Sequence, residues 1–153
     1  MEQASVQTDK PALTLHRKFA VAPEKVWRAW TEPQALRQWF GPAGEQQPVS
    51  VADIDLRVGG RFRLVFGGPD GNEHEAAGVY KDVQPHTRLV FSWCWPRTTP
   101  DRVSQITILL RAEGGGTDIE FRHEQFFDQA ARDGHERGWT VTFGKLEAFL
   151  QQA

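Results

Sequence analysis

The chain has 153 residues, of which 39% are hydrophobic and 25% are charged, and its formal net charge is −2. This length suits one globular domain with a sizeable core, and the weak net charge argues against nucleic acid as a partner. The chain opens without the apolar run of a signal peptide, and no stretch reaches 18 apolar residues, so we expect a cytoplasmic protein with no membrane span. Residues 1–12 are polar and aperiodic and are predicted to form a flexible tail before a single domain over residues 13–153.

The first predicted element is a strand over residues 13–20, where apolar and polar side chains alternate. Two short helices follow over residues 23–30 and 33–40, since each has a proline in its first turn and large apolar side chains, tryptophan among them, at helical spacing. Thr31 and Gln34 have the spacing of a capping box, which predicts that Thr31 ends the first helix and caps the second.

Turns rich in glycine and proline then separate six more segments that have the alternation of strands. We predict these strands over residues 49–56, 61–66, 75–83, 88–95, 103–111 and 117–125. From residue 132 onward, apolar side chains recur at steps of three and four, which predicts a long C-terminal helix. The predicted fold is therefore α+β, in the order β-αα-β6-α, with a curved seven-stranded antiparallel sheet around the last helix. Because one helix cannot cover such a sheet, we expect an internal cavity.

Aromatic side chains are abundant, with six Trp and ten Phe against one Tyr. Alternation along the strands and the helical stripe together place many of them facing the interior. The predicted cavity lining is Trp39, Phe62, Leu64, Phe66, Phe91, Trp93, Trp95, Phe121, His123, Trp139 and Phe143. Such a lining is typical of a site for a hydrophobic small molecule, and the same side chains would equally serve to fill a core.

His123 is the most interesting polar residue, because it shares the register of Ile119 and Phe121 and is predicted to face the cavity. Its imidazole could anchor a ligand oxygen or act as a general base, which makes it the candidate catalytic residue. The competing interpretation is a histidine that satisfies a buried hydrogen bond. Arg17 shares a face with Phe19 and is expected to find a carbonyl or carboxylate partner, or to receive an anionic ligand.

Other chemistry finds little support in the sequence. The single cysteine, Cys94, has no neighbouring histidine or acid and is predicted to be structural. The five histidines lack the spacing of metal ligands, so we predict neither a metal nor another cofactor. The run FGGPDG at 66–71 lacks the helix that follows a phosphate loop and is predicted to be a hairpin tip.

Four stretches of the sequence match the pattern of one known family. They are RKFAVAPEKVWRAWTEPQALRQWFGP (17–42), DLRVGG (55–60), GVYKDVQPHTRLVFSW (78–93) and HERGWTVTFGKLEAFL (135–150). In this order they resemble the family homologous to the heat-shock protein 90 ATPase activator, in the START/Bet v 1 (SRPBCC) superfamily, over residues 13–151. The resemblance implies the helix-grip (Bet v 1-like) fold. The motif residues Trp27, Trp30, Trp39, Gly41-Pro42 and Asp55-Arg57-Gly59-Gly60 look like signatures of that fold.

The resemblance also implies an internal cavity, which in the superfamily holds lipids, sterols, polyketides or other hydrophobic molecules. Three functions remain open. The first is a binding protein for such a ligand, in a stress-related role, and the scarcity of titratable groups on the predicted lining favours it. The second is a chaperone cofactor or protein-interaction module, although the eukaryotic activators have a second, amino-terminal domain for which 153 residues leave no room. The third is a cyclase or hydrolase that uses His123. The oligomeric state is left open.

Overall fold

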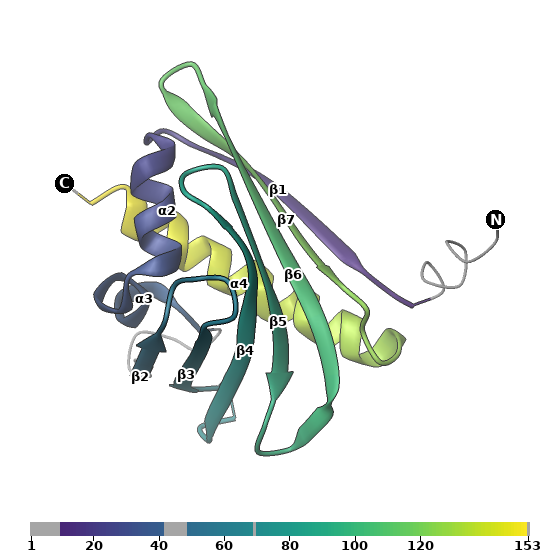
Figure 1. Ribbon diagram of the computed structural model, residues 1–153. Coiled ribbons are helices and arrows are strands. Elements are labelled where there is room, and N and C mark those ends of the chain that lie inside the picture. The colour runs from purple at the N-terminus through teal and green to yellow at the C-terminus, as the bar shows by residue number, and fades with distance from the viewer. Residues whose placement is uncertain (1–9, 42–48, 69, 153) are drawn as a thin grey trace, which may run out of the picture.

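The computed structural model describes residues 10–41, 49–68 and 70–152. The elements are β1 (Leu13–Phe19), α2 (Pro23–Thr31), α3 (Pro33–Trp39), β2 (Val49–Ile54), β3 (Arg61–Gly67), β4 (Glu73–Gln84), β5 (Arg88–Trp95), β6 (Thr99–Glu113), β7 (Gly116–Glu124) and α4 (Gln129–Leu150). The strands form one antiparallel sheet in the order β1-β7-β6-β5-β4-β3-β2. The sheet curves around α4, and α2 and α3 pack against that helix (Figure 1). This architecture confirms the predicted helix-grip order. The expected tail falls mostly on residues outside the described ranges, as does Pro42 of the family motif.

The sheet buries its inner face because the apolar positions of successive strands are in register. Leu15 pairs with Phe121, and Ile106 pairs with His123, so each of these inward-facing residues lies beside an inward-facing residue of the neighbouring strand. Helix α4 completes this core with a stripe of buried side chains that recur at helical spacing. Its fully or nearly fully buried side chains are Trp139, Thr142, Phe143, Leu146 and Leu150. Each large apolar side chain buried in this way contributes roughly 1.5–3 kcal/mol relative to an exposed one.

The capping-box prediction at Thr31 is wrong. Thr31 is the last residue of α2, and its hydroxyl donates to the carbonyl of Trp27 at 2.8 Å. The N-cap of α3 is Glu32, whose side chain makes no capping hydrogen bond. A threonine hydroxyl bonds back to the preceding turn when its own backbone is still helical, and this bond competes with the cap.

The long helix begins earlier than the apolar stripe suggests. Asp128 is its N-cap, and the Asp128 carboxylate accepts a hydrogen bond from the backbone N–H of Ala131 at 2.9 Å. The first turn, which precedes the predicted start at residue 132, is therefore fixed by a cap, and only Ala131 of it packs partly against the core.

Candidate functional site

A cleft with aromatic walls lies between the sheet and α4 and has a volume of about 210 Å³. It is partly open to solvent. Its lining comes from the end of α3, from β3 and β5, and from one face of α4. The lining residues, which define the aromatic cleft, are Phe40, Gly41, Phe66, Trp93, Trp95, Gly134, His135, Gly138, Trp139 and Thr142.

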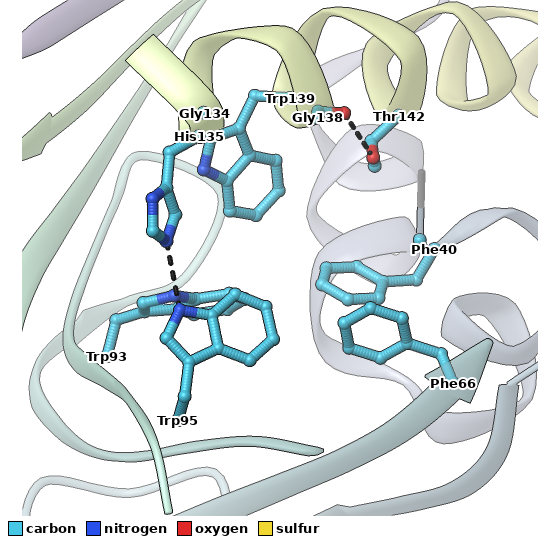
Figure 2. Close-up of a pocket in the computed structure, with 10 residues that line it drawn as sticks. Phe40, Phe66, Trp93, Trp95, Gly134, His135, Gly138, Trp139 and Thr142 are labelled. Carbon is cyan, nitrogen blue, oxygen red and sulfur yellow. Dashed lines mark hydrogen bonds between the residues drawn. The ribbon is translucent and has the colours of Figure 1, made fainter. Parts of the chain in front are cut away.

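The side walls of the aromatic cleft are rings that contact one another at right angles. Trp93 and Trp95 have centroids 5.4 Å apart and Phe40 and Phe66 have centroids 5.2 Å apart, both in edge-to-face geometry. Figure 2 shows the two tryptophans on one side of the cleft and the two phenylalanines on the other, below α4. Trp139 also lines the cleft, and its ring centroid lies 5.3 Å from that of Trp93. Edge-to-face contacts of this kind hold aromatic rings in defined orientations.

Helix α4 forms the roof with residues spaced by three or four, which places them on one face of the helix. Two of these residues are glycines, Gly134 and Gly138, so this part of the roof is bare backbone. A Cβ atom added to Gly134 would meet only the far end of the Arg137 side chain, at 3.8 Å, so open space remains next to the backbone of Gly134. The hydroxyl of Thr142 donates to the Gly138 carbonyl at 2.8 Å and is therefore already bonded within the helix.

Among the described residues that line the aromatic cleft, His135 is the titratable one. The indole N–H of Trp95 donates to its Nε2 at 3.0 Å, and its Nδ1 lies 2.8 Å from the carbonyl of Ala131. Since an indole nitrogen can only donate, Nε2 accepts and Nδ1 carries the proton. Burial lowers the pKa of His135, and its hydrogen bond to Ala131 opposes this shift only in part. The imidazole is therefore neutral near pH 7 and has no ring nitrogen left for a ligand.

His123, the candidate catalytic residue, is fully buried and lies outside the lining of the aromatic cleft. Trp139 Nε1 donates to its Nδ1 at 3.1 Å, so Nε2 carries the proton and donates to Ser104 Oγ at 2.7 Å. Ser104 in turn donates to the carbonyl of Trp93 at 3.3 Å. Burial lowers the pKa of His123 strongly, and the nearby His135 lowers it further. This geometry is that of a buried histidine with both ring nitrogens satisfied, and it orients Trp139 and Trp93.

The structure distributes the other predicted lining residues among three places. Phe66, Trp93, Trp95 and Trp139 line the aromatic cleft. Phe62, Leu64 and Phe91 line a separate void of about 20 Å³, which Trp93 and Trp139 also line. Trp39, Phe121 and Phe143 are buried in the core, as His123 is, and line neither space.

Sequence reasoning missed Phe40, Gly41, His135 and the glycines of α4. A signal for the helix residues was present, because Ala131, His135, Gly138 and Thr142 recur at steps of three and four beside the apolar stripe. Small residues and one histidine on such a face indicate a helix that does not pack closely there.

Arg17 and Cys94 have the environments of structural residues. The Arg17 guanidinium donates to the carbonyl of His16 at 2.8 Å and lies 5.7 Å from the ring of Phe143, so a carbonyl is its partner. Burial raises the pKa of the Cys94 thiol, and the Glu75 carboxylate raises it further.

Within residues 10–41, 49–68 and 70–152, no three metal-binding side chains come together. No helix in these ranges is long and apolar enough to cross a membrane.

Several solved structures share this fold. Protein CV1439 from Chromobacterium violaceum superposes with a TM-score of 0.82 at 26% identity, covering 93% of this chain and 98% of that one. The AHSA1 protein from Silicibacter pomeroyi has a TM-score of 0.78 at 29% identity, with 92% and 97% covered. A protein from Rhizobium leguminosarum has a TM-score of 0.77 at 30% identity, with 95% and 97% covered. No curated protein sequence matches the chain.

The sequence itself matches a family over most of its length. The family profile described as Activator of Hsp90 ATPase homolog 1-like protein matches residues 20–151. This range includes the two short helices, the sheet from β2 to β7 and α4. The chain therefore belongs to the family of Activator of Hsp90 ATPase homolog 1-like proteins.

Proposed function

We propose that this protein binds a compact hydrophobic molecule with an aromatic ring system in the aromatic cleft. The observation that carries the proposal is the bare helix backbone at Gly134, which has open space next to it and lines the aromatic cleft together with the aromatic rings. A glycine inside a helix costs roughly 1 kcal/mol relative to alanine, so a helix that only had to pack would be more stable with a side chain there.

The size of the aromatic cleft sets the size of the ligand. An apolar cavity of about 150 Å³ holds benzene, whereas pockets for drug-sized ligands have volumes of about 300–1,000 Å³. At about 210 Å³, the cleft suits a body of one or two aromatic rings. A whole sterol or an acyl chain would have to extend through the open side into solvent. We therefore favour the small end of the range of ligands that the superfamily suggests.

The chemistry of the lining supports binding over catalysis. His135 has both ring nitrogens in hydrogen bonds, and the Thr142 hydroxyl is bonded to the helix backbone. Among the described residues, no Asp, Glu, Lys or Arg lines the aromatic cleft. General acid–base catalysis needs a titratable group within reach of the substrate, and the ring nitrogens of His135 are already occupied by the protein.

Calorimetric titration with 2-ethylnaphthalene tests the proposal, using two glycine substitutions on the same helix. Gly134→Leu adds a side chain beneath the roof and is expected to weaken binding at least about tenfold, because the ring body and the leucine compete for the same space. Gly144→Leu is the matched control. Gly144 is exposed, and a Cβ atom there would meet nothing within 4 Å, so binding should be unchanged.

Both substitutions replace a helical glycine by a good helix former, so both should raise the free energy of unfolding by roughly 1 kcal/mol. Loss of binding in Gly134→Leu therefore cannot result from a destabilised fold. Equal affinity in the two variants would place the binding site elsewhere. Failure of the wild-type protein to bind the naphthalene would contradict the proposal, and the chaperone-cofactor interpretation would then be tested through chaperone ATPase activity.

A further inference from the structure

Two buried indole N–H groups have no hydrogen-bond partner among the described residues: those of Trp30 and Trp93. The side chains are 5% and 3% exposed, respectively. Three other tryptophans find partners. Trp39, Trp95 and Trp139 donate to Ala29, His135 and His123 at 2.9, 3.0 and 3.1 Å. Buried polar groups in folded proteins almost always have partners, so two exceptions in one small core need an explanation.

Both unpartnered tryptophans line the same space, the void of about 20 Å³. This volume is close to that of a single oxygen atom, since one water-sized sphere needs about 10–15 Å³. The void adjoins the aromatic cleft, because Phe40, Trp93 and Trp139 line both spaces. An atom that projects from a ligand past these three rings would reach the void.

We propose that the void receives a carbonyl-type oxygen of the ligand whose ring system occupies the aromatic cleft. The oxygen of a ketone has two lone pairs and can accept one hydrogen bond from each indole N–H. In the part of the chain that the structure describes, no Lys, Arg or His lines the void, so an ionised carboxylate would be buried without a counter-charge. The ligand class is therefore a compact, neutral aryl ketone or a similar carbonyl compound. This inference rests on the proposed function and adds the polar group that the ligand must carry.

A pair of probes with nearly the same shape tests the oxygen site by calorimetry: 2-acetylnaphthalene has the carbonyl, and 2-ethylnaphthalene lacks it. The wild-type protein is expected to bind the ketone about tenfold more tightly, because only the ketone satisfies the two indole donors. Trp93→Phe and Trp30→Phe each keep an aromatic ring but remove one donor, and each should reduce the preference to about threefold or less. Trp27→Phe is the control. Trp27 is buried but lines neither space, so its substitution should leave the preference unchanged.

Indole N–H resonances in the wild-type protein give a second readout that does not depend on the folding of any variant. The ketone should shift the Trp30 and Trp93 resonances downfield, and the ethyl compound should not. Equal affinity for the two probes, without these shifts, would overturn the oxygen site while leaving the proposed function intact. Failure of both probes to bind would overturn the proposed function, and the oxygen site with it.

Discussion

Two hydrogen bonds from tryptophan to histidine join the sheet to α4. Trp95 of β5 donates to His135 of α4, and Trp139 of α4 donates to His123 of β7. The rings of the two histidines are 5.1 Å apart. Because an indole N–H can only donate, each bond requires an unprotonated nitrogen on the histidine. The walls of the aromatic cleft are therefore held by groups that must stay neutral.

This requirement predicts a pH-dependent stability. Burial lowers the pKa of both His123 and His135, so below about pH 6.5 the unfolded chain binds protons that the folded protein does not. The stability contributed by the neutral histidines is fully present above about pH 6.5 and is lost as the pH falls toward the folded pKa values. Each histidine can contribute a slope of about 1.4 kcal/mol per pH unit. Urea denaturation between about pH 8 and pH 5.5 measures this slope.

His123→Gln separates the titration from the hydrogen bonds. Glutamine can accept from Trp139 and donate to Ser104, as His123 does, but it does not titrate. The variant should therefore show a shallower loss of stability below about pH 6.5, whatever its stability at pH 8. The same slope in the variant and the wild-type protein would show that His123 is not responsible.

The sequence reveals His123 more readily than its role. Alternation along β7 is sufficient to place its side chain on the inner face, but its partners Trp139 and Ser104 are 16 and 19 residues away. Whether a buried imidazole is free or satisfied depends on such distant partners, which local patterning does not contain. His135 was missed for the same reason, since its environment depends on Trp95 across the cleft.

Among the elements, the turn between β2 and β3 explains the DLRVGG motif. The backbone N–H of Gly59 donates to the carbonyl of Tyr80 at 2.8 Å, and the N–H of Tyr80 donates to the carbonyl of Gly60 at 2.9 Å. The turn is thus bound to β4, and Gly59 has a φ of +87°. At Gly60 the backbone of Asp55 approaches so closely that an added Cβ would lie 2.0 Å from its carbonyl oxygen.

Gly60→Ala should therefore destabilise the protein by about 1–3 kcal/mol, because the clash is with backbone and cannot be relieved by a side-chain rotation. Gly144→Ala, in the exposed part of α4, should instead raise the free energy of unfolding by about 1 kcal/mol. Thermal and urea denaturation measure both changes. A neutral Gly60→Ala would mean that the turn relaxes without loss of its bonds to β4.

Element order could be predicted from periodicity, but several boundaries could not, and the largest differences are at the starts of β6 and α4. Strand β6 begins at Thr99, earlier than the predicted residue 103, because its first residues pair with the end of β5 while their side chains lie largely outside the core. Without burial they show no alternation. Helix α4 likewise begins before its apolar stripe, at a turn that the Asp128 side chain caps. Periodicity reports burial, so it fails wherever backbone pairing or capping extends an element into solvent.

On the scale of the whole molecule, the two faces of the sheet differ in chemistry. The inner face carries the aromatic core, and the outer face carries ion pairs centred on Glu75 of β4. The Glu75 carboxylate accepts hydrogen bonds from Arg63 of β3 and from Arg97, each at 2.9 Å. Arg97 lies in the connection between β5 and β6, two residues after Trp95. An ion pair on the outer face thus fixes the segment that carries one wall of the aromatic cleft.

Glu75→Gln should therefore lower stability and also weaken ligand binding. Burial by itself would raise the pKa of Glu75, but hydrogen bonds from Arg97 and Arg63 outweigh it and the pKa is lowered. The carboxylate thus stabilises the fold above its ordinary pKa of 4.5, and this contribution is lost as the pH falls. Because both arginines are nearly half exposed, we expect a loss of about 1–2 kcal/mol in the free energy of unfolding near pH 7 and about threefold weaker binding of 2-ethylnaphthalene.

Asp53→Asn is the matched control. Asp53 lies 3.7 Å from the same Arg63, and its side chain is 72% exposed, so its substitution should change neither the stability nor the affinity. If Glu75→Gln destabilised the protein but left the affinity unchanged, the Trp95 wall would be held by its bond to His135 alone.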